Sequence, residues 1–320
     1  MAWTSGTAAN ERELLTALND FLTTSPELVA SGENWQQIYS GTIAATATTA
    51  PRTAYAWVAP GSAATDQIYV AARTSNSIAD DIYNVYFAGG TWFSPGAVTS
   101  TDTFWSSLTN PSSVVGLCAD AGNVRYWFIA SGRRFIVITA INTVYSSVYC
   151  GFMLPAVAPD EYPYPLVIAG STDVTLRRYS LATDYNTSIS DPRAKNCWLM
   201  YPDQGWRDFY GHTAASYNTG GTLRYLTPRG INRYNSNGAS VMQGMGPTPD
   251  SGSFPLIPVE FRADEQTGRN HFGAMDGVYW LPGLSRAAED LIDTPDGRQF
   301  LVVQNAFRVN TYDYFAVELA

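Results

Sequence analysis

Lysine is almost absent from this sequence of 320 residues, since Lys195 is the only lysine among 19 basic residues. Arginine makes bidentate and stacked contacts and is enriched at interfaces, whereas lysine is the usual solubilising surface residue. The skew indicates either a surface largely used for contacts or a bias in codon usage. The formal net charge of −9 argues against sequence-independent binding of nucleic acid, which needs clustered positive charge.

Cysteine is also scarce. Cys118, Cys150 and Cys197 are odd in number and widely spaced, which argues against a paired-disulfide framework and a CxxC metal knuckle. We expect buried free thiols. No apolar run approaches the roughly 18 residues of a membrane span, and Met1–Thr4 lacks the basic start and apolar run of a signal peptide. These absences predict synthesis in a reducing cytoplasm, without membrane insertion.

Catalytic motifs are missing as well. His212 and His271 are the only histidines, and neither lies in an HExxH, HxH or Cys/His spacing. No G-x-S-x-G elbow is present, and Gly244–Gly246 runs into Pro247 instead of opening a phosphate-binding helix. Asp80–Asp81 does not follow the order of a calcium loop. We therefore expect no catalytic residues, no cofactor and no metal.

Paired carboxylates leave one enzymatic class open, because a glycosidase needs only two of them about 5 to 10 Å apart. The candidates are Asp160 with Glu161, Glu260 with Asp264 and Glu265, and Glu289 with Asp290. With 28 acidic residues in the chain, such pairs also arise by chance in solvated loops.

Aromatic side chains, by contrast, are plentiful, with Trp 9, Tyr 20 and Phe 14. Tyrosine and tryptophan are favoured both at interfaces and in β-cores. They are dense between residues 198 and 210, beside Asp203 and Asp208. Since aromatic rings stack on sugars, this segment is the best candidate for a carbohydrate site, formed by Trp198, Tyr201, Trp206 and Tyr210.

The spread of aromatic residues, Gly 26 and Pro 18 along the chain predicts strands broken by turns. We expect a mainly β fold, with β-sandwich or jelly-roll-like domains and a short N-terminal α-helix. Residues 124–129 and 134–141 predict a hairpin, and the second arm is apolar enough to be central and covered on both faces. Further strands are predicted at 55–58, 67–73, 82–87, 143–152, 298–304 and 314–319.

Two segments are candidate contacts between subunits. Asn10 and Glu13 form a capping-box pattern that opens an amphipathic helix, with Leu14, Leu15, Leu18, Phe21 and Leu22 on one face. This helix can be a lid on its own chain or an arm onto a neighbour. The run Tyr162, Pro163, Tyr164 and Pro165 predicts a stiff extended strap, whose tyrosines are either anchors for a partner or part of a plain connector.

Three regions follow from this pattern. Residues 1–30 are expected to form a helical arm, residues 31–170 a β-sandwich domain, and residues 171–320 a second β-rich region that can pack with the first as one unit. The polar stretch from 172 to 272 is the least regular, and its role stays open.

Three stretches resemble a family of structural proteins of tailed-bacteriophage virions. They are "MAWTSGTAANERELLTALNDFLTT" (residues 1–24), "YWFIASGRRFIVITAINTVYSSVYCGFMLPAVAPDEYPYPLVIAGS" (126–171) and "GAMDGVYWLPGLSRAAEDLIDTPDGRQFLVVQNAFRVNTYDYFAVEL" (273–319). Together they cover a little over a third of the chain, and the middle stretch is the most specific.

The resemblance implies a virion component of the neck, collar, tail or baseplate, assembled in the bacterial host cytoplasm. Its partners would be other copies of itself and other virion proteins, arranged as a symmetric homo-oligomer. No catalytic motif comes with the resemblance. The alternatives are a receptor-binding module that recognises a host-surface glycan and, after it, a glycosidase that degrades polysaccharide.

Overall fold

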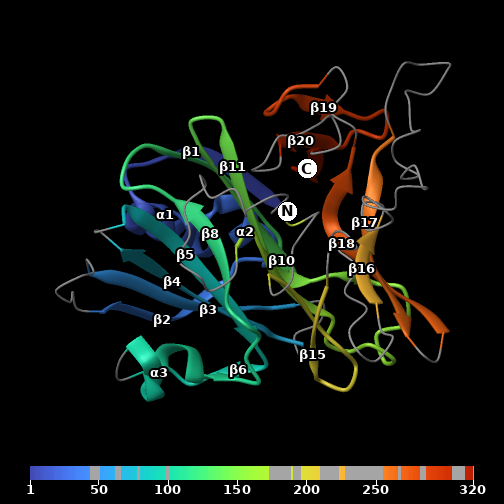
Figure 1. The fold of residues 1–320 in the computed structure, drawn as a ribbon, viewed down its shortest axis with the longest axis horizontal. Coiled ribbons are helices and arrows are strands. Elements are labelled where there is room, and N and C mark those ends of the chain that lie inside the picture. The colour runs from blue at the N-terminus through green and yellow to red at the C-terminus, as the bar shows by residue number, and fades with distance from the viewer. Residues whose placement is uncertain are drawn as a thin grey trace.

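The computed structural model describes residues 1–43, 51–61, 66–77, 80–98, 101–172, 189, 196–209, 223–227, 255–265, 268–281, 286–304 and 314–319. The chain is mainly β, its sheets are antiparallel, and a helix lies near the N-terminus, so the expected fold class is confirmed. Figure 1 shows the green strands β10 and β11 between the blue and teal strands on one side and the orange and red strands on the other.

Three large sheets make up the molecule. The central sheet has the order β1 (Ala2–Ala8), β9 (Val124–Ala130), β10 (Arg134–Ile141), β11 (Val144–Phe152), β13 (Leu166–Gly170), β14 (Cys197–Met200) and β15 (Trp206–Asp208). The N-terminal sheet has the order β2 (Gln36–Ile43), β3 (Arg52–Ala59), β4 (Ile68–Ser77), β5 (Ile82–Gly90) and β8 (Val115–Ala119).

The C-terminal sheet has the order β16 (Leu223–Thr227), β17 (Ile257–Glu265), β18 (Gly268–Trp280), β21 (Tyr314–Glu318), β20 (Gln299–Gln304) and β19 (Leu291–Asp293), and β12 (Leu154–Pro155) also pairs with β18. The helices are α1 (Glu11–Thr24), α2 (Pro26–Ser31) and α3 (Thr101–Ser106), with a 3-10 turn at Pro95–Ala97. A small sheet pairs β6 (Trp92–Phe93) with β7 (Leu108–Thr109). None of the helices in these described ranges is long and apolar enough to cross a membrane.

Strand β10 shows why the central sheet can be covered on both faces. Successive side chains of a strand point to opposite faces. Phe135 and Val137 lie in the core shared with the N-terminal sheet, whereas Ile136 and Ile138 lie in the core shared with the C-terminal sheet. All four are fully buried, which confirms the predicted central position of this strand. The hairpin of β9 and β10 is also confirmed.

Helix α1 packs onto the core between the central and N-terminal sheets. Asn10 caps it, because its side-chain oxygen accepts hydrogen bonds from the backbone N–H groups of Arg12 and Glu13, both at 3.0 Å. Glu13 in turn accepts from the backbone N–H of Ala9 at 2.9 Å. Helix α1 ends at Thr24, and Pro26 then begins α2.

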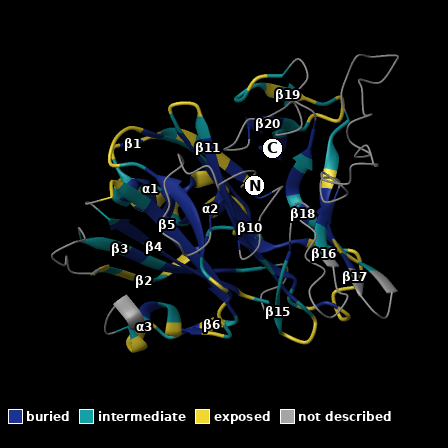
Figure 2. Ribbon diagram, viewed as in Figure 1, coloured by how far each residue is buried: buried dark blue, intermediate teal, exposed yellow. Residues whose placement is uncertain are grey.

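The core between the central and C-terminal sheets holds the end of the described chain. Strand β21 pairs with β18 on one side and β20 on the other, so it is an inner strand of its sheet, and Phe315 and Val317 are buried. The predicted final strand is therefore confirmed. Figure 2 shows buried residues running through the central strands and exposed residues mainly in turns and at the outer elements.

Strands of the central sheet come from all three regions expected from the sequence. Its first strand lies before residue 30, its middle strands lie between 124 and 170, and its last two lie after 196. The central sheet thus contains strands from both sides of each expected boundary, 30/31 and 170/171. Six strands of this sheet and of the N-terminal sheet were not predicted by the sequence analysis, namely β1, β2, β8, β13, β14 and β15.

Candidate binding site

The strap of residues 162–165 ties the three sheets together through its two tyrosines. Tyr162 is buried in the core beside the C-terminal sheet, and its hydroxyl donates to the carbonyl of Met200. The hydroxyl of Tyr164 lies 2.7 Å from the carbonyl oxygen of Gln67 and 3.1 Å from that of Gly90, both next to or in strands of the N-terminal sheet. Burial raises the pKa of both phenols.

The strap therefore leaves little surface for the partner contact that the sequence suggested. Pro165 is buried, Tyr164 is half-buried against Phe152 at a ring-centroid distance of 4.9 Å, and Pro163 is exposed. Both tyrosines are anchors, but they bind carbonyl groups of their own chain. Contact of the strap with another subunit stays a prediction, now centred on Pro163.

The aromatic stretch after residue 197 is divided between two cores. Trp198 and Trp206 pack on the side of the N-terminal sheet, and the indole N–H of Trp206 donates to the carbonyl of Asn110 at 2.9 Å. Tyr201 packs on the opposite side, against Phe272 at a centroid distance of 4.6 Å. The structure does not bring these three rings into one stacking platform. Tyr210, the fourth candidate, lies outside the described residues.

One pocket of about 220 Å³ nevertheless joins the two groups of candidates. The strap contributes Pro163 and Tyr164, and the turn between β14 and β15 contributes Tyr201 with its neighbours. The full lining is Thr91, Pro163, Tyr164, Met200, Tyr201, Pro202 and Gln204. We call this the strap pocket. Its walls combine aromatic and proline faces with a hydroxyl and an amide, so it suits an uncharged ligand or an apolar side chain.

Charged groups lie beside the strap pocket. The guanidinium of Arg207 lies over the ring of Tyr201, 5.3 Å from its centroid, and pairs with the carboxylate of Asp203 at 2.9 Å. The side-chain amide of Asn110 donates to the carbonyl of Gln204 at 2.8 Å and helps to hold the turn. The ion pair with Asp203 holds the guanidinium of Arg207 over the Tyr201 ring at the pocket wall.

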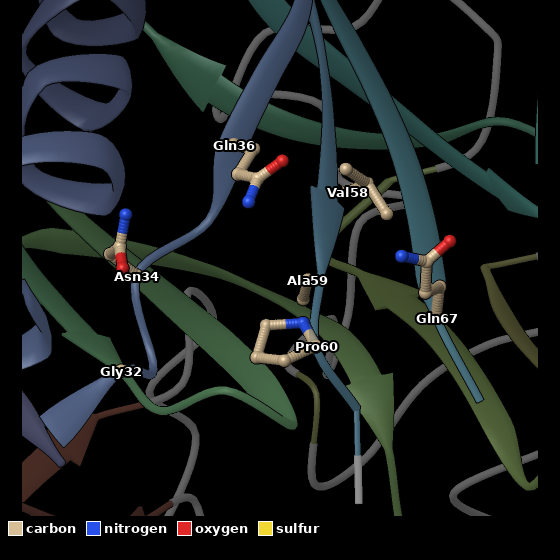
Figure 3. A pocket seen from close by; sticks show the side chains of 7 residues that line it. All are labelled: Gly32, Asn34, Gln36, Val58, Ala59, Pro60 and Gln67. Carbon is tan, nitrogen blue, oxygen red and sulfur yellow. The ribbon is translucent and has the colours of Figure 1, made fainter. Parts of the chain in front are cut away.

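A second pocket, of about 150 Å³, lies at the end of the N-terminal sheet and is shown in Figure 3. Three amide side chains line it, Asn34 and Gln36 from the segment that enters β2 and Gln67 from the residue before β4, and Pro60 lines it as well. Each amide can both donate and accept hydrogen bonds. Gln67 connects this amide pocket to the strap, because its own carbonyl accepts from Tyr164.

Sequence reasoning missed the amide pocket and the part of the strap pocket formed by Thr91 and Gln204. Each pocket is lined by segments that are far apart along the chain, so no local pattern joins them. The prolines next to them, Pro60 and Pro202, are the only local signal that a turn is held rigidly there.

The five apolar residues of α1 are already covered by their own chain. Leu14, Leu15, Leu18, Phe21 and Leu22 are all buried in the core with the central and N-terminal sheets. This packing is that of a lid. Any contact of α1 with another subunit would have to use its outer side, where Thr16 and Asp20 are exposed.

The candidate carboxylates lie in different surroundings. Asp160 and Glu161 are exposed in a turn, and Glu260 pairs with Arg262 at 2.7 Å. Glu289 accepts from Arg125 and from the hydroxyl of Tyr145, both at 2.5 Å, so it bridges the C-terminal sheet to the central sheet. The side chains of Asp264 and Glu265 lie outside the described part.

The neighbour of Glu289, Asp290, accepts from the backbone N–H of Ala287 at 2.8 Å. Among the two histidines, His271 is exposed with its Nε2 3.7 Å from Glu260, and His212 lies outside the described residues. Over the described ranges no group of three or more His, Cys, Asp or Glu residues is arranged to hold a metal ion. The three cysteines are free and buried, as predicted.

No family model matches this chain, and no curated protein matches it either.

Proposed function

We propose that this chain is a non-enzymatic structural component of a tailed-bacteriophage virion, in a symmetric oligomeric part of the neck, collar, tail or baseplate. It works by binding copies of itself and other virion proteins. The resemblance of three sequence stretches to such proteins motivates the proposal. The observation that carries it is the place of those stretches in the fold.

The three stretches are separated in sequence but contiguous in space. Strand β1 of the first pairs along its whole length with β9 of the second, and β12 of the second pairs with β18 of the third. The buried guanidinium of Arg134 lies 3.7 Å from the carboxylate of Asp276, and the hydroxyl of Tyr149 accepts from the Asp276 backbone N–H at 3.3 Å. The residues that carry the resemblance thus form one packed unit, as expected of a shared scaffold.

The composition of the surface supports binding as its role. Among the residues that the structure describes, the exposed large apolar side chains are Met1, Trp3, Val29, Trp92, Leu154, Val157 and Leu291. Tryptophan is enriched in the energetically dominant centres of interfaces, and such anchors pair with pockets on the partner. The strap pocket is of the kind that receives an apolar anchor.

The experiment is a test of particle composition. Particles purified on a density gradient from cells infected by the phage that encodes this chain are digested and quantified by mass spectrometry. We expect the chain in a fixed copy number per particle, and an amber mutation in its gene should yield particles lacking one substructure. Its absence from purified particles, with normal infectivity of the mutant, would refute the proposal.

A receptor-binding role is the second candidate, and the two pockets are what favours it. Amides, a hydroxyl and tyrosine faces are the groups that bind neutral sugars, and Gln67 links the two pockets. Binding to a glycan array that is lost in Gln204→Ala but kept in Gln37→Ala, an exposed residue on β2, would support this role. If the wild-type chain binds no glycan on the array, this second candidate is removed.

A further inference from the structure

Strand β1 is an open edge of the central sheet. In the described residues it pairs with β9 alone, over an unbroken register from Ala2 to Ala8. The five residues from Trp3 to Thr7 are all exposed or half-buried. An edge strand presents a row of unpaired backbone N–H and carbonyl groups on its outer side, which is a template for another strand.

The other described sheet edges carry features that hinder pairing. Strand β15 has three residues and carries Arg207, β16 carries Arg224, and β19 ends in Asp293. The register of β2 shifts at Gln37, and β8 is covered where Gly116 exchanges backbone hydrogen bonds with Thr172. Charges, bulges, short strands and covering segments are the means by which proteins block edges. Strand β1, with the sequence AWTSGTA, has no charge, proline or bulge.

We propose that β1 pairs in antiparallel fashion with β1 of a second copy of this chain, around a two-fold axis through Ser5. This register overlaps all seven residues, with Ala2 opposite Ala8, Trp3 opposite Thr7, and Thr4 opposite Gly6. Opposite residues then differ by an even number of positions, so each face of the strand continues into the same face of its partner. The central sheets of the two copies become one continuous sheet.

The side chains of β1 suit this partner. Trp3, Ser5 and Thr7 lie on the exposed face, where Trp3 is 41% accessible and would pack beside the threonine and serine of the partner. On the other face Gly6 carries no side chain, and the ring of Tyr126 lies over it. Thr4 of the second copy would contact the edge of that ring.

The distribution of charge directs contact between two copies to this strand rather than to the rest of the surface. Each chain has a formal net charge of −9, so two copies repel each other over most of their surfaces. An edge without charged side chains is where that repulsion is least. A two-fold contact places the same patch on both subunits, and this is the commonest symmetry of soluble homo-oligomers.

A disulfide test reads the register directly. Directly opposite residues have Cβ atoms about 4.5–5.5 Å apart, so Ser5→Cys should form a disulfide across the axis after a small adjustment. Thr7→Cys is the matched control, because Thr7 of the partner lies four positions away along the strand, at about 13 Å. The native cysteines are buried and do not interfere. We expect a crosslinked dimer on non-reducing gels for Ser5→Cys and none for Thr7→Cys.

Light scattering on the purified full chain tests the contact without crosslinking. The wild type should have the mass of a dimer, Ser5→Lys should be a monomer because two lysines meet at the axis, and Ser5→Gln should stay a dimer. Circular dichroism of each variant verifies that it is folded. A monomeric wild type, an unchanged mass in Ser5→Lys, or equal crosslinking of both cysteine variants would overturn the inference.

This inference names one self-contact within the proposed function, and the two can fail separately. If the chain is found in virions but the Ser5 variants keep the wild-type mass, the β1 pairing is wrong and the virion role stands. If the chain pairs through β1 but is absent from particles, the virion role is wrong and the pairing stands.

Discussion

At the scale of single residues, Tyr164 contacts more of the molecule than its place in a proline-rich segment suggests. Its ring packs edge-on against Phe152 of the central sheet, while its hydroxyl lies within hydrogen-bond distance of the carbonyls of Gln67 and Gly90. A hydroxyl has a single proton, which these two carbonyls share. Tyr164 therefore links the N-terminal sheet to the central sheet.

Removing this hydroxyl should weaken the fold without changing it. We expect Tyr164→Phe to lower the free energy of unfolding by about 1–2 kcal/mol, the cost of one shared hydrogen bond and of a carbonyl left without its donor. Urea denaturation measures the change. Tyr83→Phe is the control, since the described part of the chain offers its hydroxyl no hydrogen-bond partner. Equal effects of the two substitutions would contradict the role given to Tyr164.

Tyr145 gives the fold a dependence on alkaline pH. Burial, together with the hydrogen bond to Glu289 and its negative charge, raises the pKa of Tyr145 to about 12. The folded chain favours the neutral phenol. The resulting stabilisation is therefore complete below the ordinary tyrosine pKa of about 10, and is lost as the pH rises through 12.

The measurement is the free energy of unfolding of wild type and Tyr145→Phe between pH 8 and 12. We expect the difference between the two proteins to be constant up to about pH 10 and then to shrink, because the wild type loses the contribution of the neutral phenol. The phenylalanine variant cannot titrate at this position. A difference that stays flat to pH 12 would show that Tyr145 is not held neutral by the fold.

At the scale of elements, α1 is part of the core rather than a detachable arm. Leu15 is fully buried, and the residues one turn before it and one turn after it in the helix are buried as well. We expect Leu15→Ala to lower the free energy of unfolding by about 2–5 kcal/mol, the range for such a cavity in a packed core. The exposed Thr16→Ala, one residue on, should change it by less than about 0.5 kcal/mol. A small effect of Leu15→Ala would favour the arm.

Elements whose own residues decide their structure could be predicted from the sequence. Asn10, Glu13 and the leucine spacing define α1 locally, and the apolar run of β10 needs cover on both faces wherever it lies. Strand β1 could not be predicted in this way. Trp3, Thr4 and Thr7 favour a strand but Ala2, Gly6 and Ala8 do not, so it is the pairing with β9 over seven positions that makes this segment a strand.

The candidate site was predictable only in pieces. The prolines around Tyr164 indicate an extended strap, but nothing in the run shows that its tyrosines point into their own chain. Tyr201 was singled out for its ring, while its neighbour in the pocket, Thr91, has no distinguishing pattern. The pocket depends on three turns that meet only through the order of strands in two sheets, which is a property of the tertiary fold.

At the scale of the whole molecule, the central sheet is shared by two cores. The core with the N-terminal sheet contains Trp35 and Trp57, and the core with the C-terminal sheet contains Trp280. Strands such as β10 contribute alternate side chains to each. Loss of either outer sheet would expose an entire apolar face of the central sheet to water.

Unfolding should therefore be cooperative across the three sheets. We expect one calorimetric transition, with tryptophan fluorescence and far-ultraviolet circular dichroism giving the same midpoint. A fragment ending at residue 172 should not fold, because it lacks the sheet that covers one face. Two separate transitions, or a folded fragment, would show that the two cores are independent and that the shared-sheet account is wrong.

The role of the chain as a building block is tested most directly by a reconstruction of the intact virion by electron cryomicroscopy. We predict that the three-layered fold fits density in the neck, collar, tail or baseplate, in several copies related by symmetry, with side chains of each copy buried against its neighbours. A complete reconstruction in which no density accommodates this fold would contradict the account.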